Sequence, residues 1–166
     1  DNPGNREFGT SISGPPFAIF DDAYNLDNTP DTIDLISPPV DMTGRNNSSL
    51  FFYQYFEGGF GGKGEVYIRT NDLGSWMKVY ETTATSIANP DKIGIDLQKI
   101  IGARGSDKTT RIKFRWIGDG SFWWIIDDIY FHESVSGDAV GVKAENLPRG
   151  CVVDFSNPLD FTIKNV

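Results

Sequence analysis

Apolar and polar residues alternate with a period of two along much of the chain, which is the pattern of β-strands with one buried face. The clearest example is segment 111–116, in which Ile112, Phe114 and Trp116 alternate with three basic residues. We expect these three side chains to point into a core and the basic side chains to point away from it. Segment 50–56 gives no such assignment, because large side chains occupy both of its faces.

Short segments rich in β-branched and aromatic residues recur along the chain, separated by turns rich in Gly, Asn and Asp. Only residues 97–101 have the pattern of a short helical turn. Such an order is typical of an antiparallel β-sandwich and not of alternating strands and helices. We therefore expect an all-β fold, an antiparallel β-sandwich of the jelly-roll type. The expected strands are residues 17–20, 32–42, 50–57, 64–70, 76–80, 92–96, 111–117, 122–131, 151–155 and 161–165.

The composition changes after residue 133, which indicates more than one folded part. Residues rich in Gly, Ala, Val and Glu follow, as in a linker or loop, and then two strand-like segments. Two strands cannot bury a core by themselves. We expect a jelly-roll module over residues 1–135, a linker over 136–148, and the opening strands of a second, incomplete β domain over 149–166.

The chain is acidic, with 15 Lys and Arg against 23 Asp and Glu, a net charge of −8 and a pI near 4.5. A nucleic-acid binder needs clustered cations for the phosphate backbone, so we expect no nucleic-acid partner. No apolar run approaches the roughly 20 residues of a membrane-spanning helix, so we expect no membrane insertion. The single cysteine, Cys151, cannot form an internal disulfide, and we expect it to be buried and unreactive.

The residue sets of common enzyme classes are not found in the sequence. His132 is the single histidine, which excludes a two-histidine zinc site, and we expect it to be solvated. Segment 59–64 has the letters of a dinucleotide-binding loop, but a strand and not a helix follows it, so it predicts a hairpin loop. Nothing fixes a pair of acidic residues at a catalytic separation. We expect the chain not to be an enzyme.

Asp127 is the most informative acidic residue. Counting by twos along its strand places it on one face with Ile125, Ile129 and Phe131. A buried carboxylate must be hydrogen-bonded or bound to a cation. Ca²⁺ is the cation that fits best, because it is a hard ion that takes oxygen ligands. A structural calcium ion and a metal-free, hydrogen-bonded aspartate both satisfy the pattern.

Aromatic and basic residues gather on one predicted outer face if the strands that carry them share a sheet. By alternation Trp123 then points to the core and Trp124 points away from it. Aromatic rings beside arginines can stack sugar rings and bind their hydroxyls, and they also form protein-binding hot spots. Coverage of this face by loops or by the next domain is the alternative. The candidate ligand-binding residues are Tyr53, Tyr55, Tyr67, Arg69, Arg115 and Trp124.

Six motifs follow one another in a familiar order: ISPPVDM at 36–42, LFFY at 50–53, EVYIRTN at 65–71, IDL at 95–97, RIKF at 111–114 and WIIDDI at 124–129. In this order the segment 17–133 resembles the MAM-like and cleaved-adhesin jelly rolls, which are non-catalytic modules of large secreted or cell-surface bacterial proteins. The resemblance implies that Asp127 is a calcium ligand, with Asp21 or Asp22 as its partners. The tail 151–166 looks like the opening strands of an immunoglobulin-like domain.

We therefore hypothesise a non-catalytic adhesion or ligand-binding module of a larger secreted or cell-surface bacterial protein. Its partners would be a glycan or a protein, together with adjacent domains of the same polypeptide. The alternative is a structural accessory domain that positions a neighbouring catalytic or repeat domain and binds no ligand itself.

Overall fold

The computed structural model describes residues 16–21, 31–45, 47–59, 61–86, 88–104, 109–118, 122–133, 142–145 and 160–163. The chain divides into two compact units, residues 1–133 and residues 134–166. In the described part of the chain there is one helix, of seven residues, and it is too short and too polar to cross a membrane.

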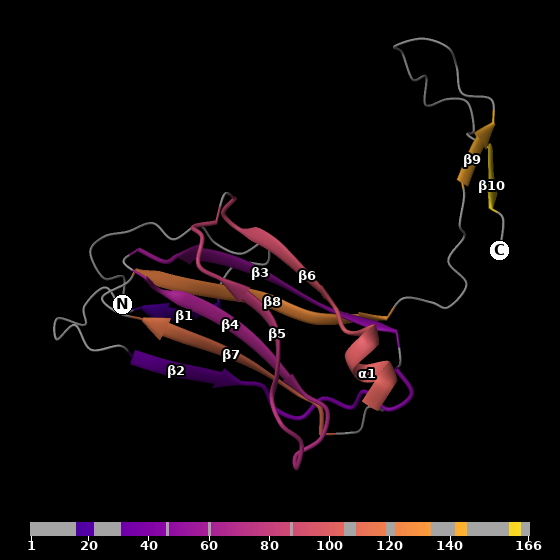
Figure 1. Ribbon diagram of the computed structural model, residues 1–166. Coiled ribbons are helices and arrows are strands. Elements are labelled where there is room, and N and C mark those ends of the chain that lie inside the picture. The colour runs from indigo at the N-terminus through magenta and orange to yellow at the C-terminus, as the bar shows by residue number, and fades with distance from the viewer. Residues whose placement is uncertain are drawn as a thin grey trace, which may run out of the picture. The chain divides into compact units, whose positions relative to one another are not determined.

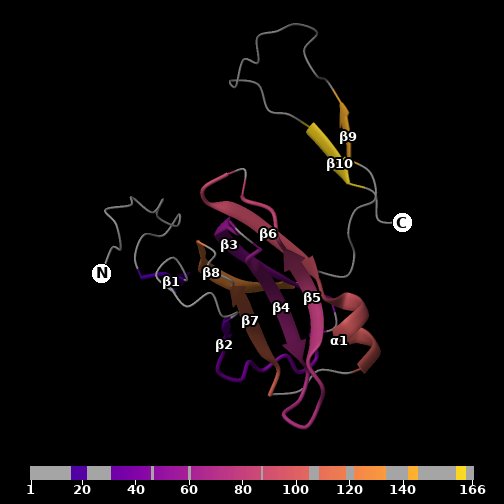
Figure 2. The ribbon, with the colours of Figure 1, turned by 60° about the vertical axis from the view of Figure 1, so that its left-hand side comes forward.

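The first unit is a sandwich of two four-stranded antiparallel sheets (Figures 1 and 2). The first sheet has the order β1 (Ala18–Asp21), β8 (Trp123–Glu133), β3 (Ser48–Glu57), β6 (Asp91–Asp96). The second sheet has the order β2 (Asp31–Ile36), β7 (Arg111–Gly118), β4 (Lys63–Arg69), β5 (Met77–Thr82). Helix α1 (Gln98–Arg104) lies at one end. Eight strands in this order form a jelly roll, so the predicted fold class is confirmed.

The core lies between the two sheets and is built from the inner faces of their strands. Strand β3 alternates strictly between buried and half-buried residues, with Leu50, Phe52 and Phe56 inside. On the second sheet the inward positions of β7 and β4 are also buried, as their alternation predicts. These residues are Ile112, Phe114, Trp116, Val66 and Ile68, each at most 2% exposed.

Strand β8 contains a β-bulge that reverses its alternation. Phe51 of β3 pairs with Tyr130, but Tyr53 pairs with Asp127, so β8 has one residue more than β3 between these pairs. Asp128 lies in this bulge with a φ of 48°, in the left-handed region. An inserted residue changes which side chains face the core on either side of it.

The bulge overturns two expectations about the tryptophans of β8. Trp124 is fully buried in the core, so placing it on the outer face was wrong. Its neighbour Trp123 is half-buried on the opposite face, so placing Trp123 in the core was also wrong. Counting by twos from Phe131 assumes that the alternation continues through Asp128. The backbone of Asp128 is left-handed, so the alternation breaks there.

The glycine-rich connection 58–62 joins strands of different sheets. Strand β3 belongs to the first sheet and β4 to the second, so the expected hairpin at 59–64 is wrong. The connection is closed by a hydrogen bond from the Gly62 N–H to the Gly58 carbonyl, at 2.8 Å. Gly59 and Gly61 have φ values of 52° and 120°, which glycine adopts without a steric penalty. These conformations let a short loop cross from one layer to the other.

The described part of the second unit consists of one antiparallel pair, β9 (Val142–Glu145) with β10 (Asp160–Ile163). Residues 136–148 were expected to be a linker but contain β9, so this stretch is not a linker throughout. Cys151 and the expected strand 151–155 lie outside the described residues. The resemblance of this unit to an immunoglobulin-like domain stays a prediction.

Deleting residues 134–166 should leave the free energy of unfolding of the first unit unchanged within about 0.5 kcal/mol. The physical reason is that the core residues which the structure describes, from Phe20 to Phe131, all belong to the first compact unit. Urea unfolding of the full chain and of residues 1–133, followed by tryptophan fluorescence, measures the difference. A loss of several kcal/mol on deletion would show that the second unit completes the core of the first.

Candidate functional site

The outer surface of the first sheet carries a row of aromatic side chains, here called the aromatic face. They come from alternate positions of β3 and from the positions of β8 that lie beside them. All are half-buried or exposed, in contrast to the fully buried residues of the inner face. The aromatic face consists of Phe51, Tyr53, Tyr55, Trp123 and Tyr130.

Phe51 is held at one end of the aromatic face by its neighbours on both strands. Its ring stacks on that of Tyr130, with centroids 5.4 Å apart and planes inclined by 18°. On the other side it covers Gly94 of β6, where an added Cβ would lie 2.7 Å from the ring. His132 contacts the Phe51 ring edge-on and is exposed, as predicted. Packing therefore fixes this end of the face before any ligand binds.

The opposite end of the aromatic face is formed by Tyr55 and Trp123, whose ring centroids lie 6.3 Å apart. Phe122 packs against the other side of the Trp123 ring, with centroids 5.4 Å apart. Tyr53 lies between the two ends. Because side chains on one face of a strand repeat about every 6.6 Å, the three aromatic positions of β3 span about 13 Å.

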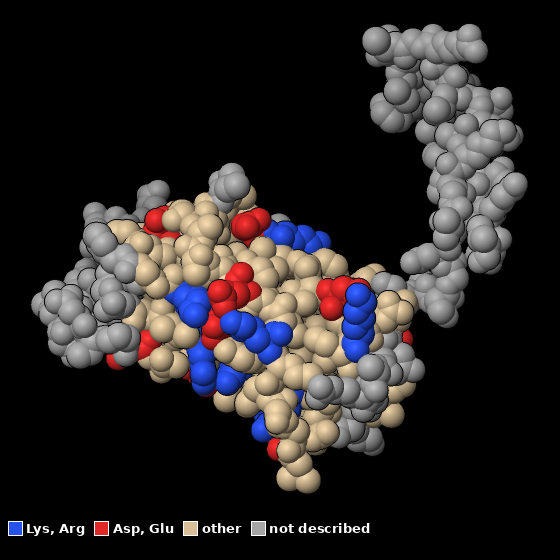
Figure 3. Space-filling view, viewed as in Figure 1, with Lys and Arg blue, Asp and Glu red and all other residues tan. Residues whose placement is uncertain are grey.

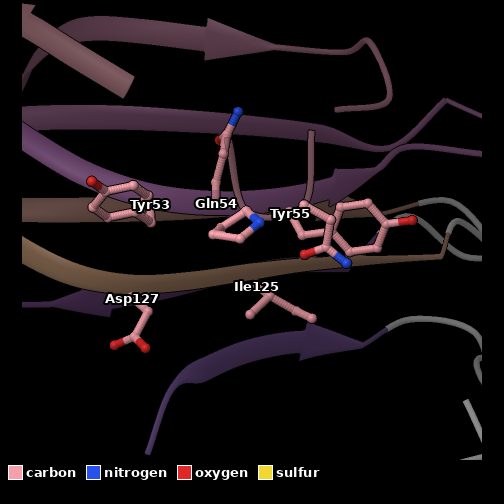
Figure 4. Close-up of a pocket in the computed structure, with 7 residues that line it drawn as sticks. Tyr53, Gln54, Tyr55, Ile125 and Asp127 are labelled. Atoms are coloured by element: carbon pink, nitrogen blue, oxygen red, sulfur yellow. The ribbon is translucent and has the colours of Figure 1, made fainter. Parts of the chain in front are cut away.

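A shallow hollow lies in the middle of the aromatic face (Figure 4). Tyr53 and Tyr55 come from β3, and Ile125 and Asp127 come from β8 beside it. The segment before β6 contributes the remaining wall. The lining residues are Tyr53, Gln54, Tyr55, Asn89, Pro90, Ile125 and Asp127.

Asp127 points to the outer side of the sheet and not into the core. One carboxylate oxygen, Oδ1, accepts the Asp128 backbone N–H at 2.8 Å. The other, Oδ2, is shielded from solvent and has no hydrogen-bond partner among the described residues. A shielded acceptor of this kind carries a desolvation cost, and a ligand in the hollow does not reach it in this conformation.

The structure does not bring the predicted calcium ligands together. Asp21 pairs with Trp123, four residues along β8 from Asp127, a separation of about 13 Å at 3.3 Å per residue. Asp22 lies outside the described residues. In the part of the chain that the structure describes, no group of three His, Cys, Asp or Glu side chains gathers as a metal site requires. The calcium site stays a prediction.

The outer surface of the second sheet is different and is here called the charged face. Figure 3 shows its Lys and Arg side chains beside Asp and Glu on one side of the molecule. Arg115 donates two hydrogen bonds to Asp34, at 2.7 and 2.8 Å. The Arg115 guanidinium lowers the pKa of the Asp34 carboxyl, and Asp34 in turn raises the pKa of Arg115. The charged face consists of Asp34, Lys63, Glu65, Tyr67, Lys78, Lys113 and Arg115.

Tyr67 and Arg69 also have partners within the protein. Tyr67 donates to Glu65 at 2.5 Å, and the Lys113 ammonium lies 4.6 Å from the centre of the Tyr67 ring. Arg69 pairs with Asp72 at 2.9 Å and lies 4.8 Å from the centre of the Trp76 ring. The charged groups of the charged face therefore pair largely with one another, whereas the Nε of Arg69 beside it has no hydrogen-bond partner among the described residues.

The structure divides the six predicted ligand-binding residues among three places. Tyr53 and Tyr55 lie on the aromatic face, Tyr67, Arg69 and Arg115 lie on the outer side of the second sheet, and Trp124 lies in the core. The prediction that they share one sheet is wrong, because β3 and β8 belong to one layer and β4 and β7 to the other. A ligand role for any of them stays a prediction.

The predicted ligand-binding set did not include Phe51, Trp123, Tyr130 or Lys92. Only the cross-strand register, with the bulge in β8, shows that they lie on one face. Lys92 pairs with Tyr53, and its ammonium lies 4.9 Å from the centre of the Phe51 ring.

No protein-family model and no curated protein matches the chain. Among solved structures it is similar to the carbohydrate-binding module CBM27-1 of Caldicellulosiruptor saccharolyticus, crystallised in complex with mannohexaose. That match has a TM-score of 0.45 at 14% identity and covers 62% of this chain and 67% of the module. A second is CBM28, a carbohydrate-binding module specific for non-crystalline cellulose, with a TM-score of 0.41, 12% identity and coverage of 71% and 74%. What this chain binds is inferred from its own residues.

Proposed function

We propose that the chain is a non-catalytic ligand-binding module that binds a glycan on its aromatic face. The observation that carries this proposal is the set of five half-buried or exposed aromatic side chains on one sheet surface, beside a hollow that contains Asp127. Aromatic rings held in place by packing offer flat apolar surfaces to the faces of sugar rings. The Asp127 carboxylate adds a negative charge beside these rings.

The charged face supports the same assignment by contrast. Its cations and carboxylates bond to one another, so a ligand that bound there would have to break ion pairs such as that between Arg115 and Asp34. On the aromatic face, the hollow beside Tyr53 and Tyr55 is lined by no residue of the described ion pairs, so a ligand there breaks none of them. Glycan binding on the aromatic face therefore disturbs fewer contacts.

The wider setting of the module belongs to the same proposal. We propose a MAM-like or cleaved-adhesin type of module in a larger secreted or cell-surface bacterial protein, where glycan binding serves adhesion. The structural calcium ion at Asp127, with Asp21 or Asp22, stays a separate prediction, and the glycan site is proposed for the metal-free aspartate. The motifs that carry the resemblance, above all WIIDDI at 124–129, support the proposal.

Replacing Tyr53 or Tyr55 with alanine should weaken glycan binding by about 5- to 100-fold, the range expected when an aromatic anchor is truncated. The first measurement is an array of plant, bacterial and animal glycans probed with the full chain. Isothermal titration with the best array ligand then gives the affinity of each variant. Thermal melting checks that each variant is folded.

Tyr67→Ala is the matched control, because Tyr67 is a half-buried tyrosine on the outer side of the other sheet. It should bind the array ligand as the wild type does. Loss of binding in Tyr67→Ala but not in Tyr53→Ala would move the site to the charged face. Failure of the wild type to bind any glycan on the array would contradict glycan binding and favour a protein ligand or an accessory domain.

A further inference from the structure

We infer that the glycan is acidic, with a sugar carboxylate bound by Lys92 while the ring that carries it stacks on Tyr53. This inference rests on the proposed function and names the class of sugar. It is carried by the arrangement of Lys92, Tyr53 and Asp127 in one row across the first sheet.

The row is set by the strand register. Tyr53 of β3 pairs with Lys92 of β6 on one side and with Asp127 of β8 on the other. Adjacent strands lie about 4.8 Å apart, so the backbones of Lys92 and Asp127 are about 10 Å apart with the Tyr53 ring between them. A sugar ring on Tyr53 is therefore flanked by a cation on one side and a carboxylate on the other.

Lys92 differs from most other cations of the described structure. Arg45, Lys63, Arg69, Lys78, Arg111, Lys113 and Arg115 each lie within 4 Å of a carboxylate. Among the residues whose side chains the structure describes, Lys92 and Lys99 have no such partner. The contacts of the Lys92 ammonium are aromatic rings, with centres 4.9 Å away at Phe51, 5.8 Å at Tyr53 and 5.9 Å at Tyr130.

The aromatic rings hold the Lys92 ammonium at the ligand surface by cation–π attraction. A hydrogen bond with the Tyr130 side chain raises the pKa of Lys92, which is charged at neutral pH in any case. A positive charge with no carboxylate partner, placed beside a stacking platform, favours a ligand that supplies the anion, since charge-assisted hydrogen bonds are the stronger ones. Seven of the other described cations already have carboxylate partners.

Asp127 fixes which way the sugar lies. Its side chain lines the hollow, and its negative charge repels a second carboxylate. The sugar carboxylate must therefore lie on the β6 side of Tyr53, and hydroxyl or amide donors must lie on the β8 side. A neutral sugar would satisfy Asp127 but would leave the Lys92 charge without its anion.

The test compares oligomers of galacturonic, glucuronic and mannuronic acid with the same oligomers after reduction of each carboxyl to a primary alcohol. Sialylated oligosaccharides and their neutral parents form a second arm, which separates a uronic acid from a sialic acid as the source of the carboxylate. The full chain, Lys92→Gln, Lys92→Arg and Asp127→Asn are titrated with each. Because Lys92 is exposed, its variants should melt as the wild type does.

We expect the wild type to bind an acidic oligomer at least about 10-fold more tightly than its reduced form, the effect of one charge-assisted bond. Lys92→Gln should lose this preference while keeping its affinity for the reduced form, and Lys92→Arg should restore most of it. Asp127→Asn should weaken the binding of acidic and of reduced oligomers by the same factor.

Equal binding of acidic and reduced oligomers by the wild type, or an unchanged preference in Lys92→Gln, would overturn the acidic-sugar inference and leave glycan binding intact. Binding of array glycans that are neutral, with no binding of any acidic oligomer, would overturn it in the same way. Absence of binding to every glycan would instead contradict the proposed function.

Discussion

Replacing Trp124 with alanine should lower the free energy of unfolding by about 3 to 5 kcal/mol, the range for truncating a large buried aromatic residue. The Trp124 side chain is fully buried and contacts rings from both sheets. Its ring centroid lies 5.7 Å from that of Phe20 and 5.9 Å from that of Phe114. The backbone of β4 approaches it closely, since a Cβ added at Gly64 would lie 3.1 Å from the indole. The cavity left by alanine could not close without moving both layers.

A buried polar chain adds to the loss. The indole Nε1–H of Trp124 donates to Gln54 Oε1 at 2.9 Å, and Gln54 Nε2 donates to the Tyr80 hydroxyl at 3.0 Å. This chain links the first sheet to the second through the core. Without the indole, the buried Gln54 oxygen loses its donor. If no water replaces the indole, this costs a further ~1 to 3 kcal/mol.

Urea unfolding of Trp124→Ala and Trp123→Ala makes the comparison sharp, because the two tryptophans are adjacent and point to opposite faces. Trp123→Ala should lose less stability, since Trp123 is half-buried, and should weaken glycan binding instead. Trp124→Phe, which keeps most of the ring, should fall between the wild type and alanine. A Trp124→Ala variant as stable as the wild type would place the indole outside the core.

Most strand positions of the first unit could be predicted from the sequence because alternation is a local property, but the expected strand 32–42 ends at Ile36. Residues 111–116 alternate so regularly that the inward side chains of β7 follow from the letters alone. Which strands share a sheet is not local. The five residues 58–62 are short enough for a hairpin, and only packing shows that they cross between layers.

The faces of β8 could not be predicted for a related reason. A single residue, Asp128, takes a left-handed backbone conformation and shifts the register against β3. Aspartate adopts this conformation more readily than most residues, but the letters Asp127-Asp128 do not show which of the two does so. The shift moved Trp124 into the core and Asp127 out of it.

Only part of the candidate site could be predicted from the sequence. Tyr53 and Tyr55 follow from the alternation of β3 once one face is known to be buried. Lys92 joins them through the pairing of β6 with β3, which no spacing in the sequence indicates. The alternation of a single strand does not indicate which strand, far away in the sequence, pairs with it.

The stability of the first unit should fall by about 3 kcal/mol through Glu65 as the pH is lowered from about 5 toward 2. Glu65 is 4% exposed. Burial raises its pKa, but three partners outweigh burial: the Tyr67 hydroxyl at 2.5 Å, Lys78 Nζ at 3.2 Å and Lys63 Nζ at 3.3 Å. Together they lower the pKa of Glu65 from 4.5 to about 2.

The sign of the effect follows from proton binding. Between pH 4.5 and 2 the unfolded chain binds a proton at this glutamate and the folded chain does not, so lowering the pH favours unfolding. The stabilisation is complete above the unfolded pKa and is lost as the pH falls through the folded one. A difference of about 2.5 in pKa corresponds to about 3 kcal/mol at 1.36 kcal/mol per unit.

Glu65→Gln isolates this contribution, because glutamine keeps the size of the side chain and has no charge to titrate. At pH 7 the variant should be less stable than the wild type by about 2 to 3 kcal/mol, and the difference should shrink toward zero as the pH approaches 2. Asp34, whose pKa Arg115 also lowers, titrates in both proteins and cancels in the difference. Urea unfolding at pH 7, 4.5, 3.5 and 2.5 measures it. A difference that stayed constant with pH would mean that Glu65 stabilises the fold by its shape and not by its charge.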